Sequence, residues 1–334
     1  MQLQEQQQQR IIQQRKMQQQ AGQISSAQNA GGMAMAPQYT NQSMGSALDD
    51  IPIQDADYNF PPTRTASLES ACREGSLDRV QSIVTSEQST PRFLHSGLVS
   101  ALAAGQVDIA RYLLSAGAVI SRAVPSHVLT APKNQQIPSF ELLAEHGWTP
   151  NSPGFYGDVL LPSVVTDLPL LRWFLDHGAN PALGAQRDNR DRMGGSETNS
   201  CSALEAASRQ GSVEAVRLLL DAGARVEYGL PLHSAAGAHP EGTNIYYPPV
   251  HPTPEFDAGA DVNQRDESRH MVPRLPILLA TMAGAVERVK WLLEHGANPE
   301  ADGTYGSALS HAERYGDREM KRVIEEGVKA RKWV

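Results

Sequence analysis

The feature that most constrains the fold of this chain is a pair of glycines twelve residues apart, which recurs along the sequence. A short Ala-rich segment precedes the first glycine, and a longer Leu-rich segment separates the two. Glycine ends a helix readily because it adopts the left-handed conformation that a Cβ disfavours. The spacing therefore predicts a two-turn helix, a longer second helix and then a reversal of the chain. The pairs are Gly105 with Gly117, Gly211 with Gly223, and Gly284 with Gly296.

The longer segment of each unit carries an apolar stripe in one register. Counted from the first glycine, positions +2, +5, +8 and +9 are apolar, and two further segments keep these columns without that glycine. Such spacing predicts amphipathic helices that bury one face. The six sets are Leu77, Val80, Ile83, Val84; Val107, Ala110, Leu113, Leu114; Ile137, Phe140, Leu143, Ala144; Leu168, Leu171, Phe174, Leu175; Val213, Val216, Leu219, Leu220; and Val286, Val289, Leu292, Leu293.

The repeat has a period of 30 to 45 residues. The second glycines stand at 117, 147, 178, 223, 259 and 296, in steps of 30, 31, 45, 36 and 37 residues. Ankyrin repeats have a period of about 33 residues. The longest step contains an insertion at 187–199, rich in Arg, Asp, Asn and Gly, which we expect to be a solvated loop.

Residues 67–327 resemble the ankyrin-repeat family, and two short motifs within them carry the resemblance. Leu230-Pro231-Leu232-His233 is similar to the Thr-Pro-Leu-His opening of the first helix, and Gly296-Ala297-Asn298-Pro299 is similar to the start of the hairpin. The resemblance implies an all-α ankyrin-repeat solenoid of about seven to eight helix-turn-helix units with short hairpin loops. The whole chain resembles fungal-type multi-ankyrin proteins with a low-complexity N-terminus. By the same resemblance, His233 ties its own hairpin to the neighbouring one. Serines stand at the Thr position, where a hydroxyl caps a helix: Ser96, Ser126, Ser202 and Ser307.

Other segments depart from the repeat. Residues 1–62 are Gln-rich, with Gln at 11 of the first 20 positions, and predict disorder because they bury too little apolar surface to offset chain entropy. Prolines at 240–256 forbid a regular helix; this is either an irregular insertion across a weakened layer or an imperfectly assembled coding sequence. In the unit at 126–147, Pro132 interrupts the first helix and Pro138 starts the second. The polar unit Ser307–Gly327 predicts a C-terminal cap, followed by a tail at 328–334.

Composition bounds the function. Acidic residues outnumber basic ones 37 to 29, giving a net charge of -8, which argues against direct nucleic-acid binding. The two cysteines, Cys72 and Cys201, suit a reducing compartment. The N-terminus has no apolar signal-peptide core, and the near-apolar run 275–286 is too short to span a bilayer. We therefore expect a cytoplasmic or nuclear protein.

The sequence predicts no enzyme, no cofactor, no metal and no catalytic residue. Phosphate-binding, nucleophile-elbow and zinc-helix motifs are missing. His146, His177 and His295 each precede a tip glycine, where an imidazole contacts the last carbonyls of the helix. His239, His251 and His270 lie in or near irregular segments, but their spacing is not that of metal ligands. Two carboxylate pairs, Asp221 with Glu214 and Asp261 with Asp257, are typical of solvated helix ends and turns.

By resemblance, partner contacts fall on the two residues before each first-helix glycine. The strongest candidates are Arg209, Met282, Arg314 and Tyr315, because Arg and Tyr are favoured interface anchors. The leading prediction is a monomeric intracellular adaptor or scaffold that binds one or more proteins through a concave groove. The alternative is a nuclear regulatory protein whose Gln-rich tail makes transcription-related contacts. Tyr246 and Tyr247 are a second exposed-aromatic candidate. The remaining groove positions are Arg73, Glu74, Ala103, Ala104, Gln210 and Ala283.

Overall fold

The structure is a computed structural model that describes residues 50–51, 54, 62–86, 89–210, 212–237, 253–266, 274–303, 306–315 and 318–331. Within these residues the chain is all-α, and extended structure is confined to isolated bridges such as Gly184 with Glu197. The helices are α2 Pro62–Glu74, α3 Leu77–Ser86, α4 Pro91–Ala103, α5 Val107–Ser115, α6 Val124–Val128, α7 Lys133–Glu145, η2 Phe155–Gly157, η3 Leu161–Ser163, α8 Leu168–Asp176, α9 Ser202–Gln210, α10 Val213–Asp221, η4 Val226–Tyr228, α11 Pro231–Ala236, α12 Thr253–Asp257, α13 Pro276–Met282, α14 Val286–Glu294, α15 Ala308–Tyr315 and α16 Arg318–Arg331.

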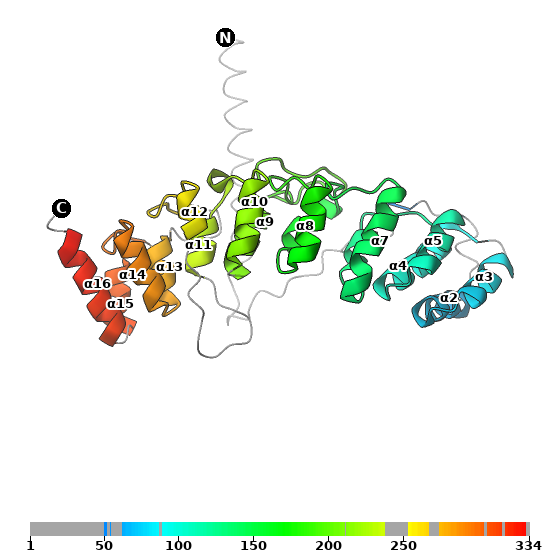
Figure 1. Cartoon of the computed structure of the whole chain (residues 1–334), viewed down its shortest axis with the longest axis horizontal. Helices are drawn as coiled ribbons and strands as arrows, with labels where there is room; N and C mark the ends of the chain where they lie inside the picture. The colour runs from blue at the N-terminus through cyan, green and yellow to red at the C-terminus, as the bar shows by residue number, and fades with distance from the viewer. Residues whose placement is uncertain are drawn as a thin grey trace, which may run out of the picture. The chain divides into compact units, whose positions relative to one another are not determined.

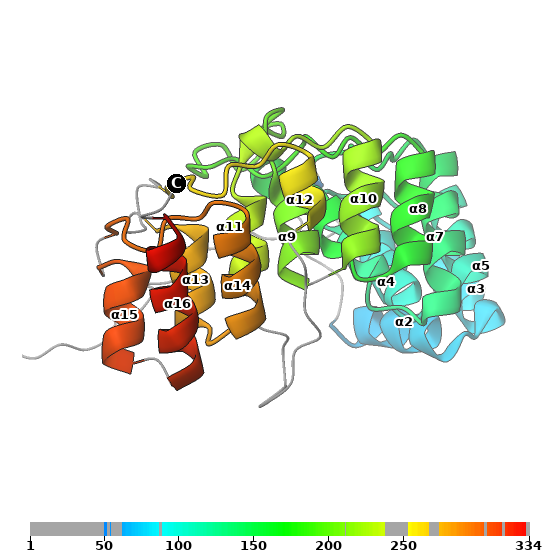
Figure 2. The same cartoon turned by 60° about the vertical axis from the view of Figure 1, so that its left-hand side comes forward.

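The helices form successive pairs that stand side by side in chain order (Figures 1 and 2). First helices pack on first helices, as α4 does on α2 and on α6, and α13 does on α11 and on α15. Second helices form a parallel row, in which α5 packs on α3 and on α7, and α16 packs on α14. Each unit therefore covers the apolar face of its neighbour, which is the arrangement that the repeated stripe predicts.

The +5 position of the predicted stripe is buried in all six second helices and the +8 position in five of them, the exception being the half-buried Ile83. Val289 and Leu292, at positions +5 and +8, are both 0 % exposed, whereas Val286 and Leu293 are half-buried. The stripe is wrong at Ala144, which is exposed, because Leu142 lies on the buried face of α7 in its place. The core is thus carried by the +5 and +8 columns of the second helices together with the first helices.

The glycines adopt the predicted conformation. Gly105 and Gly284 end first helices at φ +73° and +68°, and the tip glycines Gly117 and Gly296 have φ +101° and +91°. Gly211 lies outside the described residues. A residue with a Cβ is strained at these angles, so the twelve-residue spacing has a backbone cause.

The histidines at the helix ends also behave as predicted in two units. His177 Nδ1 lies 2.7 Å from the carbonyl oxygen of Trp173, and His295 Nδ1 lies 2.7 Å from that of Trp291. Each imidazole stacks on the same tryptophan, with ring centroids 4.0 Å and 3.8 Å apart. His233 Nε2 lies 3.1 Å from the carbonyl oxygen of Arg274, which joins the first helix to the neighbouring hairpin.

Three expected helix starts are wrong. Helix α4 begins at Pro91, because the Thr90 hydroxyl accepts from Phe93 N–H at 3.1 Å, so Ser96 lies inside the helix. Ser126 likewise lies inside α6. Ser202 is the first residue of α9, and its N–H donates to the Ser200 hydroxyl. Ser307 does cap α15, accepting from Ser310 N–H at 3.1 Å.

Prolines and termini shift other boundaries. Pro138 lies inside α7 instead of starting it, because the helix begins at Lys133, directly after Pro132. The unit before α8 has only the 3-10 turns η2 and η3 where a first helix stands elsewhere. Helix α2 begins at Pro62, before the expected start at 67, and α16 continues past 327 to Arg331.

The two expected irregular segments differ. The insertion at 187–199 is largely exposed but anchored, since Arg192 lies over the Phe155 ring at 3.8 Å and the Ser196 hydroxyl donates to Gly157 O at 2.6 Å. Of the segment 240–256, residues 240–252 lie outside the described part of the chain, together with Tyr246 and Tyr247. Its end forms the short helix α12, Thr253–Asp257.

Candidate functional site

Four predicted contact residues lie at the ends of first helices, and all four are exposed. Met282 is the last residue of α13 and is 44 % exposed; Tyr315 is the last residue of α15 and is 69 % exposed. Arg314 precedes Tyr315, and Arg209 is near the end of α9. Helices α13 and α15 pack on each other. In the repeat, Met282 corresponds to Arg314, and Tyr315 corresponds to Ala283. Arg209 belongs to α9, which is separated from α13 by α11.

Exposed large apolar side chains are rare in this array. Among the described residues they are Met193, Met282 and Tyr315. Two of these three stand at the positions selected from the sequence. Single exposed apolar residues are ordinary, but Met282 and Tyr315 both lie at the ends of first helices that pack on each other.

The charges at these positions differ along the array. Arg73 lies 3.8 Å from Glu69, and Glu74 accepts from Arg79 at 2.9 Å, so the N-terminal positions are engaged within the chain. Within the described residues, neither Arg209 nor Arg314 has an ion-pair partner. Paired cations are largely neutralised, so the positive charge available to a partner lies at the later units.

An aromatic cluster surrounds Tyr315. The Arg314 guanidinium lies 5.9 Å from the Tyr315 ring centroid, and the His311 ring centroid lies 5.0 Å from it. Burial lowers the pKa of His311, and the positive charge of Arg314 lowers it further. A neutral imidazole beside a tyrosine favours an apolar or stacking contact over an ionic one.

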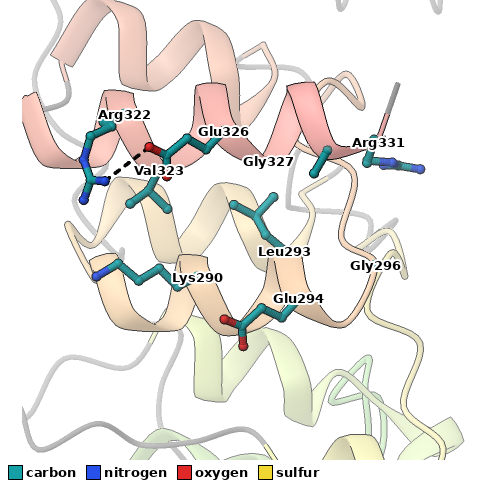
Figure 3. Close-up of a pocket in the computed structure, with 10 residues that line it drawn as sticks. Lys290, Leu293, Glu294, Gly296, Arg322, Val323, Glu326, Gly327 and Arg331 are labelled. Atoms are coloured by element: carbon teal, nitrogen blue, oxygen red, sulfur yellow. Dashed lines mark hydrogen bonds and ion pairs between the residues drawn. The ribbon is translucent and has the colours of Figure 1, made fainter. Parts of the chain in front are cut away.

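A groove lies between the second helices of the last two units (Figure 3). It has a volume of about 790 Å³ and lies between α14 and α16. Leu293, Val323 and Gly327 supply its apolar part, while charged side chains stand around it. Three of these charges are paired within the chain: Lys290 with Glu287 at 2.6 Å, and Arg322 with Glu326 at 3.2 Å. None of the predicted contact residues lines this groove.

Both cysteine side chains, Cys72 and Cys201, are buried. Burial raises the pKa of the Cys72 and Cys201 thiols to about 12, with smaller contributions from nearby glutamates. A thiol is the unreactive form of cysteine. In the part of the chain that the structure describes, no three His, Cys, Asp or Glu side chains converge to hold a metal ion. Nor is any described helix both long and apolar enough to cross a bilayer.

Two buried polar groups lie near the short unit α11–α12. Glu255 is 2 % exposed and accepts from the Ser208 hydroxyl at 2.6 Å, and burial raises the pKa of its carboxyl group. Arg288 is 4 % exposed and donates to the carbonyl oxygen of Ala236 at 3.2 Å. The bond to Ala236 satisfies a carbonyl at the end of α11, which is a structural role.

The repeated helix pair, its left-handed glycines and the His233 tie between hairpins define the architecture. The fold is that of an ankyrin-repeat domain. No protein-family model and no curated protein matches the chain. Among solved structures, the ankyrin repeat domain of Bcl-3, described as a unique member of the IkappaB protein family, is 21 % identical, with a TM-score of 0.42, covering 72 % of this chain and 87 % of that one. The human ASB11 ankyrin repeat domain is 16 % identical, with a TM-score of 0.41, covering 78 % of this chain and 96 % of that one.

Ankyrin-repeat domains are generally protein-binding modules and typically non-catalytic. These likenesses indicate no partner for this chain. The observations that bear on binding are the exposure and the charge of the candidate residues. On that basis Met282, Arg314 and Tyr315 form one surface. Arg209 lies apart from it by one unit.

A contact upstream of the first helix has no counterpart in the sequence predictions. Ile51 is 1 % exposed, and its carbonyl oxygen accepts from the Arg92 guanidinium. The rest of residues 1–61, apart from Asp50 and Gln54, lies outside the described part. The pair Ile51 and Ile53 beside Asp50 was the available signal, but the partner Arg92 is 41 residues away from Ile51.

Proposed function

We propose that this chain is an adaptor or scaffold that binds another protein through the first-helix ends of its C-terminal units. Met282, Arg314 and Tyr315 form the centre of the contact, and Arg209 extends it along the array. The carrying observation is that Met282 and Tyr315 are 44 % and 69 % exposed at the ends of two first helices that pack on each other. Burying two such side chains is a common way for an interface to gain affinity.

The chemistry of this surface favours a partner with an apolar side chain flanked by acidic groups. Arg209 and Arg314 have no ion-pair partner within the described residues, so a carboxylate binds them without breaking an existing pair. Tyr315 offers a ring face and a hydroxyl, and Met282 adapts its shape to an apolar neighbour. The same proposal places the protein in the cytoplasm or the nucleus and takes it to be a monomer.

Affinity capture with the full chain tests the proposal. The variant Met282→Gln/Tyr315→Ala removes both exposed apolar groups, and Met193→Gln is the matched control, because Met193 is 41 % exposed but lies on the insertion. We expect the proteins recovered by the wild type and by Met193→Gln to be depleted from the double variant. Arg209→Ala/Arg314→Ala tests the charges in the same way. Equal recovery by all variants would contradict the assignment of this surface.

A further inference from the structure

A dipeptide upstream of the first helix lies against the second and third units. The carbonyl oxygen of Ile51 accepts from Arg92 Nε at 3.1 Å and from Arg92 Nη2 at 2.9 Å. The Asp50 carboxylate accepts from the backbone N–H of Arg122 at 2.5 Å. Arg92 stands in the first turn of α4, and Arg122 lies between α5 and α6, so Asp50–Ile51 bridges two adjacent units.

The array side of this contact is held in place by its own bonds. The Arg122 guanidinium donates to the carbonyl oxygens of Gly154 at 3.0 Å, Gly194 at 2.9 Å and Met193 at 2.6 Å. Ser121, the preceding residue, bonds the buried His95 ring at 2.9 Å. The Arg122 residue whose backbone N–H donates to Asp50 is therefore held by contacts that do not involve the dipeptide. Such preorganisation lowers the entropic cost of binding.

The contacts to Asp50–Ile51 are those by which proteins recognise peptides. The Arg92 guanidinium donates to one main-chain carbonyl, the Arg122 backbone N–H donates to one carboxylate, and the aliphatic side chain of Ile51 is 1 % exposed. A cavity of about 220 Å³ adjoins Asp50 and is lined in part by Ile120, Pro125 and Trp148. There is room beside the aspartate for a further side chain of a ligand.

We propose that Arg92, Ser121 and Arg122 form a peptide-binding site for an aspartate followed by a branched aliphatic residue, occupied in this structure by the chain's own Asp50–Ile51. A partner that carries the same dipeptide displaces the upstream segment from the array. This site is distinct from the surface at Met282 and Tyr315.

The covalent link between Asp50–Ile51 and the array explains why the chain's own dipeptide occupies the site. Only ten residues, 52–61, separate Ile51 from Pro62, and a short covalent linker gives an effective concentration on the order of millimolar. A free peptide competes against that concentration, so its apparent association constant is the intrinsic one multiplied by the fraction of time the site is empty. For an intrinsic dissociation constant of about 0.1 mM and an effective concentration of about 1 mM, removing the tethered ligand raises the apparent affinity about tenfold.

Fluorescence anisotropy of a labelled peptide with the sequence of residues 46–56 tests this with the full-length chain. We expect Asp50→Ala/Ile51→Ser to bind the peptide about tenfold more tightly than the wild type. A control peptide with Asp50 and Ile51 in reversed order does not bind. Adding Arg92→Gln to the double variant removes the gain, whereas adding Arg79→Gln, an exposed arginine on α3, leaves it intact.

Hydrogen exchange at the Arg122 amide gives a second readout that does not depend on the Arg92 variant. We expect this amide to be protected in the wild type, to exchange faster in Asp50→Ala/Ile51→Ser, and to regain protection when the peptide is added. Equal peptide affinity in the wild type and the double variant, or an Arg122 amide unaffected by the peptide, overturns the proposal. Loss of partners at Met282 and Tyr315 leaves both readouts unchanged, so the two proposals fail separately.

Discussion

Replacing His95 by glutamine should flatten the dependence of stability on acid pH. His95 lies in α4, is 3 % exposed, and its Nε2 lies 2.9 Å from the Ser121 hydroxyl. Burial lowers the pKa of His95 from 6.5 to about 4, although the nearby Asp50 charge raises it. A glutamine amide places a nitrogen where the imidazole Nε2 lies, so the variant keeps the bond to Ser121 without a titrating group.

The magnitude follows from the two pKa values. Above pH 6.5 the imidazole is neutral in both the folded and the unfolded chain, so it adds no pH dependence. As the pH falls from 6.5 to about 4, the unfolded chain binds a proton that the folded chain does not, and the folded state loses stability. A shift of this size corresponds to about 3 kcal/mol lost by pH 4, with a slope of up to about 1.4 kcal/mol per pH unit.

Urea unfolding followed by circular dichroism at several pH values between 7.5 and 4 measures this. The other histidines with lowered pKa values, His127, His233 and His311, are present in both proteins, so their effects cancel in the comparison. We expect the wild type to lose about 3 kcal/mol more than His95→Gln between pH 7.5 and pH 4. Parallel curves for the two proteins would refute the reasoning that His95 is held neutral by burial.

Three further substitutions probe packing. Gly327→Ala places a Cβ 2.7 Å from Leu293 Cδ2, 2.8 Å from its Cδ1 and 3.1 Å from its Cγ, so this clash should outweigh the gain in helix propensity of up to about 1 kcal/mol and lower the free energy of unfolding in urea titrations. Gly157→Ala places a Cβ 2.2 Å from the backbone oxygen of Gly195 at φ +74°, so the same assay should register a loss of more than about 1 kcal/mol. Arg122→Ala removes three bonds to backbone carbonyls, and hydrogen exchange in the insertion should become faster, whereas unchanged rates would contradict an anchoring role.

The sequence predicted the parts of the fold that local pattern determines. The +5 and +8 columns, for example Val289 and Leu292, are buried because helical periodicity places them on one face. The tip glycines have positive φ because the chain reverses there, and His177 and His295 reach helix carbonyls within their own turn. These features depend on neighbours in the sequence, which a pattern can represent.

The sequence could not predict features that depend on distant contacts. Arg288 occupies the +4 position of α14 and is buried, because the end of α11 offers it a carbonyl 52 residues away. Pro138 lies inside α7, because the chain already becomes helical at Lys133. Of the candidate site, the sequence selected exposed residues correctly, but no pattern in it joins Asp50 and Ile51 to Arg92 and Arg122.

The unit formed by α11 and α12 is the point at which the proposed function and the stability of the array meet. The described part of helix α12 is Thr253–Asp257, and the second helices α10 and α14 stand on either side of it. In a stack, each unit is stabilised by its interfaces with its neighbours. Arg288 and Glu255 are buried there with hydrogen bonds to Ala236 and Ser208, and such polar contacts fix an arrangement but add little net stability. Because Arg209 precedes this layer and Met282 follows it, a partner that contacts both residues would bridge the layer and add to the interfaces that hold it.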